Sequence, residues 1–288
     1  MRELTERECR ALSSSIRWIG DIPGIHRATH LPTGLLVAIH TQDYRRYVIR
    51  NYWKMKAVGP RLAGQWRRGE TVERIARART FPPIVIGRII ASEIGVSKTD
   101  FRKMVTGAKI EHDLPRDHRR MASEVARVVR SDYMDSPWSL EIYRELGRVG
   151  ERLVTEWLSE KGLRFQTEQD QKGGAGVPTP DFLFRSPQRI DGRNNISWIE
   201  SKAFFGDLQH IRRHHRYQVS RYEETYGKGM IIYWYGVSRE AKQEGPIEEF
   251  LDASIFESRR GIDRLMEEVP YKLVLGATRG PEAISLQS

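Results

Sequence analysis

The sequence predicts an α/β fold in which helices flank a mixed central sheet, preceded by an all-helical region with a helix-turn-helix segment. Strand-like runs occur in the second half of the chain, the apolar spacing of the first half is helical, and the excess positive charge lies in the first half. The 288 residues are long enough for two domains. We expect a basic helical region over residues 1–130 and an α/β domain over residues 131–288.

The composition indicates a soluble globular chain, because 39% of the residues are hydrophobic and 30% are charged. No apolar run approaches the roughly 20 residues that cross a bilayer, and the first residues lack the apolar core of a signal peptide. We therefore expect a cytoplasmic protein without a membrane partner, associated with the nucleoid if it is prokaryotic. The single cysteine, Cys9, excludes an internal disulfide framework and a multi-cysteine zinc site.

The net charge of +10 is divided unevenly along the chain. Residues 1–130 hold 26 Lys and Arg against 13 Asp and Glu, a balance of +13, whereas residues 131–288 hold 22 against 25, a balance of −3. This division is expected where one region contacts phosphates and the other carries acidic chemistry. A solvated, arginine-rich helical surface is the alternative.

The first half carries the signals of short helices. Residues 71–104 predict three of them: one capped by Thr71, one that follows Pro82-Pro83 and ends near Gly95, and one that opens at Ser97. Short helices joined by tight turns are the layout of a helix-turn-helix module, although a small helical bundle has the same pattern. A polar connection over 106–118 and a helix near 119–130 follow.

The second half alternates helical and strand patterns. We expect a helix over 146–162, strands over 163–169 and 181–185, a loop over 186–195, a strand over 196–205, a polar helix over 208–226 and a buried strand over 229–236. Residues 271–277 could complete the sheet as a further strand, and residues 252–269 could supply an interface between subunits.

The candidate chemistry lies on two of these strands. Glu200 and Lys202 are two residues apart, so in a strand they share one face at about 6–7 Å. A hairpin would bring Asp181 beside Glu200, and two close carboxylates attract a hard cation such as Mg²⁺, for which Mn²⁺ can substitute. Lys202 would then orient or deprotonate a water that attacks a phosphodiester. A surface salt bridge between Glu200 and Lys202 is the alternative, which their apolar neighbours disfavour.

Further residues are predicted to join this site. Glu151, on the preceding helix, is a candidate catalytic carboxylate and metal ligand, although it could also be an exposed helix glutamate. Ser201 is a further expected metal ligand, and Glu168 is a weaker acidic candidate. Gln218 and Tyr222 share one helix face, so Gln218 could hold the catalytic lysine and Tyr222 a substrate phosphate; packing is the alternative role for both.

The polar helix also carries basic residues. Arg212, Arg213 and Arg216 are predicted to contact the phosphates of a nucleic acid, with a solvated basic face as the alternative. His210 and His214 have the spacing of a zinc pair. No third ligand at a matching spacing is evident in the sequence, so we do not expect zinc.

Three segments together resemble the TPD-motif family of PD-(D/E)xK nucleases, which has archaeal members. They are Thr179-Pro180-Asp181, the block WIESKAFFGD over 198–207 and the block GMIIYWYG over 229–236, within roughly residues 140–240. The resemblance implies a restriction-endonuclease-like fold related to Holliday-junction resolvases and preceded by helix-turn-helix segments. It implies that Asp181, Glu200 and Lys202 form the catalytic set. The small size and the lack of an evident eukaryotic extension favour a prokaryotic, archaeal member.

These observations favour a divalent-metal-dependent DNA endonuclease, either selective for branched structures or tolerant of sequence. Two alternatives stay open: a nucleic-acid-binding adaptor that keeps the fold with little activity, and an RNA-processing nuclease. The presence of all three catalytic residue types favours an enzyme over an adaptor. A homodimer is an open expectation, because resolvase-like enzymes that cut two strands commonly act as dimers.

Overall fold

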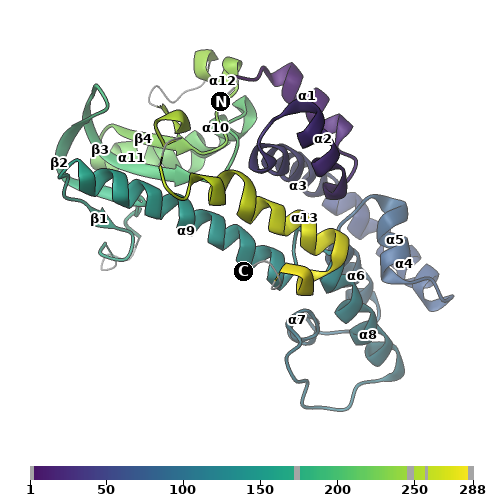
Figure 1. Ribbon diagram of the computed structural model, residues 1–288. Coiled ribbons are helices and arrows are strands. Elements are labelled where there is room, and N and C mark those ends of the chain that lie inside the picture. Colours follow the sequence, from purple (N-terminus) through teal and green to yellow (C-terminus); the bar gives the residue numbers. More distant parts are fainter. Residues whose placement is uncertain (1–2, 172–175, 245–249, 257–258, 285–288) are drawn as a thin grey trace. The chain divides into compact units, whose positions relative to one another are not determined.

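The computed structural model describes residues 3–171, 176–244, 250–256 and 259–284, and shows a mixed α/β architecture (Figure 1). The chain forms two compact units that are discontinuous in sequence. The sheet unit comprises Met1–Arg17, Pro23–Ile39 and Arg144–Pro270; the helical unit comprises Trp18–Ile22, His40–Tyr143 and Tyr271–Ser288. A domain boundary near residue 130 stays a prediction. None of the helices in the described ranges is long and apolar enough to span a membrane.

The sheet has five strands in the order β1-β2-β3-β4-β5 over the described residues. β1, β2 and β3 pair antiparallel, whereas β3, β4 and β5 pair parallel, so the predicted mixed sheet is confirmed. The strands are β1 (Gln166–Thr167), β2 (Phe182–Ile190), β3 (Arg193–Lys202), β4 (Gly229–Tyr233) and β5 (Phe250–Asp252).

The expected loop over 186–195 is wrong, because β2 and β3 run through most of it as a hairpin. Asp191 and Gly192 form the turn, with φ angles of 50° and 79°. An Asp-Gly pair with two positive φ angles suits a two-residue hairpin turn, which matches the twist of the flanking strands. The polar residues that suggested a loop are mostly exposed, yet their backbone still pairs across the hairpin.

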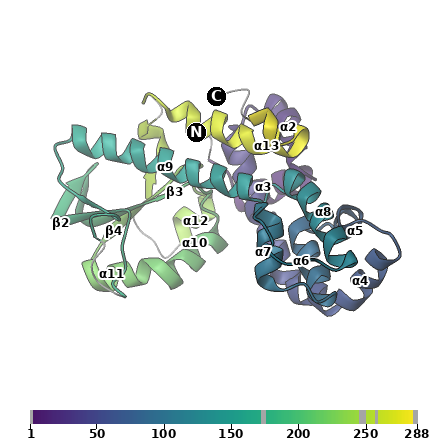
Figure 2. The same ribbon diagram turned by 90° about the horizontal axis from the view of Figure 1, so that it is seen from below.

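Helices cover both faces of the sheet (Figure 2). The end of α9 (Pro137–Glu160) lies over one face and buries Leu153, Val154 and Leu158 completely. The polar helix lies over the other face as three successive segments: α10 (Leu208–His214), the π-helical turn η2 (His215–Val219) and α11 (Ser220–Tyr226). Every residue of β4 is buried, as expected for a strand covered on both faces.

The strand expected over 271–277 is wrong, because these residues belong to the helix α13 (Val269–Arg279). A short apolar run does not by itself distinguish a strand from a buried helix, and here the run continues a helical segment that begins at η4 (Arg264–Glu268). β5 completes the sheet instead. An interface over 252–269 stays a prediction, and residues 257–258 of that stretch lie outside the described residues.

The first helices of the chain belong to the sheet unit, which the sequence patterns did not indicate. These elements are α1 (Glu6–Ser15), α2 (Ile22–Thr29) and the start of α3 (Thr33–Ala57). Glu6 anchors α1, because its Oε1 accepts hydrogen bonds from Leu208 N at 2.8 Å and Ser238 Oγ at 2.6 Å. Ser238 directly precedes α12 (Arg239–Glu244).

The helical unit contains the three short helices predicted for residues 71–104. Thr71 caps α5 by accepting from Arg74 N at 3.2 Å, and Ser97 caps α7 by accepting from Asp100 N at 3.0 Å. Gly95, with a φ of 83°, follows the end of α6, as expected for a helix C-terminus. The helices after α3 are α4 (Gly59–Arg67), α5 (Val72–Arg79), α6 (Pro83–Glu93), α7 (Lys98–Thr106) and α8 (Arg116–Ser131).

Two buried carboxylates also tie the helical unit together. Glu124 of α8 accepts a hydrogen bond from Val72 N at 2.7 Å, and Asp132, just after α8, accepts one from Ile84 N at 3.0 Å. These N–H groups lie in the first turns of α5 and α6, where a helix leaves its donors without intrahelical partners. The carboxylates therefore act as caps supplied from a distant part of the chain.

Candidate active site

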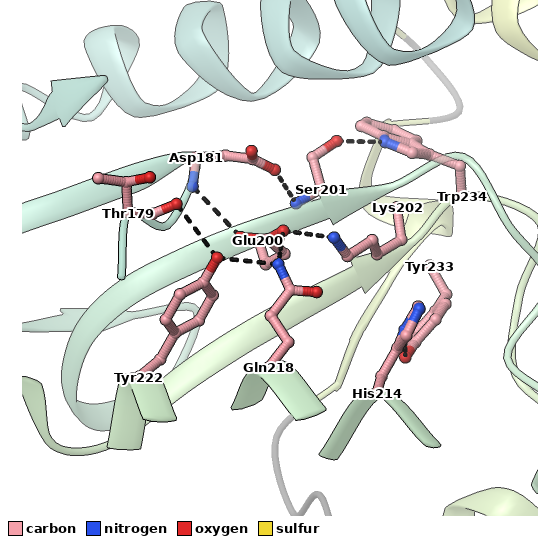
Figure 3. A network of polar contacts seen from close by, with 10 residues as sticks. All are labelled: Thr179, Asp181, Glu200, Ser201, Lys202, His214, Gln218, Tyr222, Tyr233 and Trp234. Carbon is pink, nitrogen blue, oxygen red and sulfur yellow. Dashed lines mark hydrogen bonds and ion pairs between the residues drawn. The ribbon is translucent and has the colours of Figure 1, made fainter. Parts of the chain in front are cut away.

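The pairing of β2 with β3 brings the two predicted carboxylates together. Phe182 pairs with Ile199, which places Asp181 next to Glu200 at the end of the pairing. Asp181 N donates to Glu200 Oε2 at 3.3 Å, and Asp181 Oδ2 accepts from Ser201 N at 2.8 Å (Figure 3). The structure therefore places Asp181, Glu200 and Ser201 in direct contact.

Lys202 lies on the same side of β3 as Glu200, as their spacing predicts. Its Nζ forms an ion pair with Glu200 Oε1. Glu200 is only 4% exposed, and the Lys202 side chain is 16% exposed. Because removing one partner of a buried ion pair leaves an uncompensated charge, this pair differs from an exposed salt bridge.

The helix that covers this face supplies two further polar groups. Gln218 Nε2 donates to Glu200 Oε1 at 2.9 Å and to the Tyr222 hydroxyl at 2.8 Å. The Tyr222 hydroxyl donates in turn to Thr179 O at 3.1 Å, at the start of the Thr-Pro-Asp segment. Gln218 thus joins the site as predicted, whereas Tyr222, which was expected to hold a phosphate, is 5% exposed and has its hydroxyl engaged within the protein.

Two acidic side chains at the site, Asp181 and Glu151, have raised pKa values. Burial and the nearby Glu200 raise the pKa of Asp181 to about 7. Glu151 is exposed on α9, and its partial desolvation, together with Glu168 and Glu200, raises its pKa above the ordinary range. Asp181 Oδ1 and the Glu151 carboxylate accept no hydrogen bond and join no ion pair within the part of the chain that the structure describes. The site therefore concentrates negative charge that the protein itself compensates only in part.

On the opposite side of β3, Ser201 meets residues that the sequence patterns did not indicate. Ser201 Oγ accepts a hydrogen bond from Trp234 Nε1 at 2.8 Å. Gly150 of α9 allows this contact, because a Cβ at Gly150 would lie 2.5 Å from Trp234 Nε1 and 3.0 Å from Ser201 Oγ. A glycine inside a helical pattern was the available signal for such a close approach.

His210 and His214 are adjacent, with ring centroids 4.0 Å apart. His214 Nδ1 lies 3.2 Å from the Tyr233 hydroxyl, and burial, His210 and Lys202 lower the pKa of His214 to about 3. Over residues 3–171, 176–244, 250–256 and 259–284, no group of three or more His, Cys, Asp or Glu side chains could by itself hold a metal ion.

The remaining predicted residues lie on the surface. Arg212, Arg213 and Arg216 are exposed, and none of them bonds to Asp181, Glu200 or another described site residue. Glu168 is also exposed, and its charge raises the pKa of Glu151. The structure thus brings Asp181, Glu200, Ser201, Lys202 and Gln218 together by direct contact.

The site falls within a region that matches a known family model. Residues 117–252 match the model described as "Protein of unknown function TPD sequence-motif". Over these residues, just under half of the chain, the sequence is similar to the TPD family. In this chain the TPD motif is Thr179-Pro180-Asp181, so the matched region contains both carboxylates and the lysine of the site.

Several curated proteins are similar to this chain. The mouse CDAN1-interacting nuclease 1 is 28% identical over 219 residues, which cover 71% of this chain and 76% of the mouse protein. The human CDAN1-interacting nuclease 1 is 35% identical over 123 residues, which cover 42% of each chain. No solved structure gives a significant match.

Proposed function

We propose that this protein is a divalent-metal-dependent nuclease that hydrolyses phosphodiester bonds, with DNA as its substrate. The observation that carries the proposal is that Glu200, near the end of β3, contacts both the backbone N–H of Asp181 and the ammonium of Lys202. Two similar proteins, from mouse and human, are named as nucleases, and the human similarity reaches 35% identity. Two neighbouring carboxylates and a lysine are the groups expected for metal-assisted hydrolysis of a phosphate ester.

The donor set fits a hard divalent cation. Asp181 and Glu200 would hold Mg²⁺, or Mn²⁺ in its place, with Glu151 and Ser201 as additional ligands. Magnesium commonly takes one or two carboxylates and completes its shell with water and substrate phosphates, so a cluster of three protein ligands is not needed. The raised pKa of Asp181 supports this fit, because a bound cation would favour the ionised carboxylate. When bound, the ion would lower the pKa of a water and offset charge on the phosphate.

The protein's own groups would orient the reaction. Lys202, held by Glu200, would place its ammonium beside the attacking water or the scissile phosphate. Gln218 and Tyr222 would fix the Glu200 carboxylate, because the Gln218 amide donates to Glu200 and to the Tyr222 hydroxyl. Arg212, Arg213 and Arg216 would contact the substrate backbone from the exposed side of the same helix.

We further propose that the sheet unit has a restriction-endonuclease-like fold. The support is an α/β unit in which helices cover both faces of a mixed sheet. The acidic site also lies where the antiparallel β2–β3 hairpin meets the parallel strand β4. No step of the proposed chemistry depends on this fold assignment.

The helical unit is proposed to bind nucleic acid through a helix-turn-helix module. A pocket of about 530 Å³ lies between α3, α6 and α7. Four basic residues line it: Lys56, Arg88, Lys98 and Arg102. None of the four forms an ion pair with another described residue, so their charge is available to phosphates.

The experiment is a cleavage panel with purified protein. Branched DNA, duplex DNA, single-stranded DNA and RNA are each incubated with Mg²⁺, Mn²⁺ or EDTA, and the products are resolved on denaturing gels. We expect cleavage of DNA with either metal and none with EDTA. Cleavage of RNA alone would favour the RNA-processing alternative, and tight binding without cleavage of any substrate would favour the adaptor.

A further inference from the structure

A pocket of about 290 Å³ adjoins the acidic site in the sheet unit. One wall is the segment just before Asp181, and the other is the helix formed by η2 and α11. Gln218 and Tyr222 line this pocket and also belong to the hydrogen-bond network of Glu200. A group bound in the pocket would therefore lie next to the catalytic residues.

Hydrogen bonds hold the two walls together. The Tyr226 hydroxyl donates to Pro178 O at 2.8 Å, and the Tyr222 hydroxyl donates to Thr179 O at 3.1 Å. Arg221 Nη2 donates to Gly176 O at 3.4 Å. Because main-chain oxygens of the segment are fixed to helix side chains, the pocket is already formed before a ligand arrives.

Two side chains that line this pocket are strongly exposed. Tyr217 is 65% exposed and Val177 is 50% exposed, and both line the pocket. The Tyr217 ring makes no aromatic contact within the described ranges. Every nucleobase presents a π-face, so an exposed tyrosine that lines a pocket offers a stacking surface for one base.

We propose that this pocket receives one unstacked base of the nucleic-acid substrate, stacked on Tyr217, beside the phosphate that is cleaved. The inference rests on the proposed nuclease function and adds a substrate class to it: nucleic acid with an unpaired nucleotide next to the scissile bond. Arg221, exposed on the pocket wall, would contact a neighbouring phosphate. A base inside a duplex would reach the pocket only after the cost of unstacking and unpairing.

The test measures binding of the full chain in EDTA, so that cleavage does not intervene. Oligonucleotides that carry 2-aminopurine are prepared as single-stranded DNA, single-stranded RNA, branched DNA with an unpaired base, and blunt duplex. We expect quenching of an unpaired 2-aminopurine by the wild type, and about 5- to 100-fold weaker binding of these substrates by Tyr217→Ala. Tyr217→Phe, which keeps the ring, should bind like the wild type.

The matched control is Tyr271→Ala, which removes an exposed tyrosine of α13. It should leave binding and quenching unchanged, and thermal melting should show that Tyr217→Ala folds like the wild type. Equal affinity and equal quenching for the wild type and Tyr217→Ala would overturn the inference. It would also be overturned if Tyr217→Ala weakened binding of a blunt duplex as much as binding of substrates with an unpaired base. The experiments distinguish the base pocket from the nuclease function. If a base stacks on Tyr217 but no substrate is cleaved in Mg²⁺ or Mn²⁺, only the proposed nuclease function is contradicted.

Discussion

Glu200 is a nearly buried carboxylate that is fixed from several sides. Lys202 Nζ and Gln218 Nε2 both contact its Oε1, and Asp181 N donates to its Oε2. Asp181 differs, because only its Oδ2 is engaged among the described residues, by Ser201 N. The two carboxylates therefore differ: Glu200 is held in place, whereas Asp181 keeps one oxygen that the proposed cation would bind.

Removing the Gln218 amide tests whether Glu200 must be held in place by the covering helix. Gln218→Ala deletes one donor to Glu200 and one to Tyr222, so the proposed metal ligand Glu200 loses one of the groups that orient it while Lys202 and Asp181 remain. We expect a fall in kcat of about 10- to 100-fold with little change in KM, as for other groups that orient a metal ligand. Single-turnover and steady-state cleavage rates would measure it.

The control for this variant is Gln209→Ala, which removes an exposed glutamine of α10 outside the network. Its kcat and KM should equal those of the wild type. An unchanged kcat in Gln218→Ala would mean that Glu200 needs no support from the helix.

At the scale of single residues, the sequence predicts those contacts that follow from the repeat of a strand or a helix. Glu200 and Lys202 share a strand face, and Gln218 and Tyr222 share a helix face, because the periods of strands and helices are fixed. The bond between Trp234 and Ser201 was not predictable, since it depends on how closely α9 approaches the sheet at a glycine.

At the scale of single elements, α6 depends on a carboxylate from outside its own sequence. Asp132 is 1% exposed and accepts hydrogen bonds from Ile84, Met134 and Asp135 N–H groups. Burial raises the pKa of Asp132 to about 6, against an ordinary value of 3.8. A raised pKa means that this side chain contributes most to stability below about pH 4, and that the contribution falls as the pH rises through 6.

We therefore expect Asp132→Ala to destabilise the protein by about 2–4 kcal/mol, because three backbone donors, two of them buried, lose their acceptor. The loss should be about 1–3 kcal/mol larger at pH 4 than at pH 7.5. Urea unfolding of wild type and variant at both pH values, followed by tryptophan fluorescence, would measure the difference. A loss that is equal at the two pH values, or larger at pH 7.5, would contradict the raised pKa.

The two wrong predictions share one cause. A local sequence pattern does not show which strands pair with each other or which helix a segment continues. Residues 271–277 are apolar enough for a strand, but they continue a helix that began upstream. Residues 186–195 are polar enough for a loop, but the turn at Asp191–Gly192 lets their backbones pair. The helices with clear caps, at Thr71 and Ser97, were predicted correctly because a cap is a local interaction.

At the scale of the whole molecule, charge and chemistry are separated along the chain. The balance is +13 over residues 1–130 and −3 over the rest, and the acidic site lies in the second part. This division was readable from composition. Membership of residues 3–17 and 23–39 in the sheet unit was not, because it depends on long-range anchors such as Glu6.

The basic pocket of the helical unit gives a test of nucleic-acid binding. The double variant Lys98→Glu with Arg102→Glu should weaken duplex binding by at least about 10-fold and lower the salt slope of log Kd by roughly 2. Fluorescence anisotropy over a salt series would measure both quantities. The control, Arg239→Glu with Lys242→Glu on α12, reverses the same charge elsewhere, and an equal effect there would show a nonspecific response.

The most direct test of the proposed function is the single-turnover cleavage rate of Asp181→Asn and Lys202→Ala in Mg²⁺. Both variants should lose at least about 100-fold in rate while they largely retain substrate affinity, because each removes a group that acts on the reacting phosphate or water. The control Asp170→Asn, an exposed aspartate that bonds to Thr167, should cleave like the wild type. Cleavage at the wild-type rate by both Asp181→Asn and Lys202→Ala would contradict the assignment of the active site.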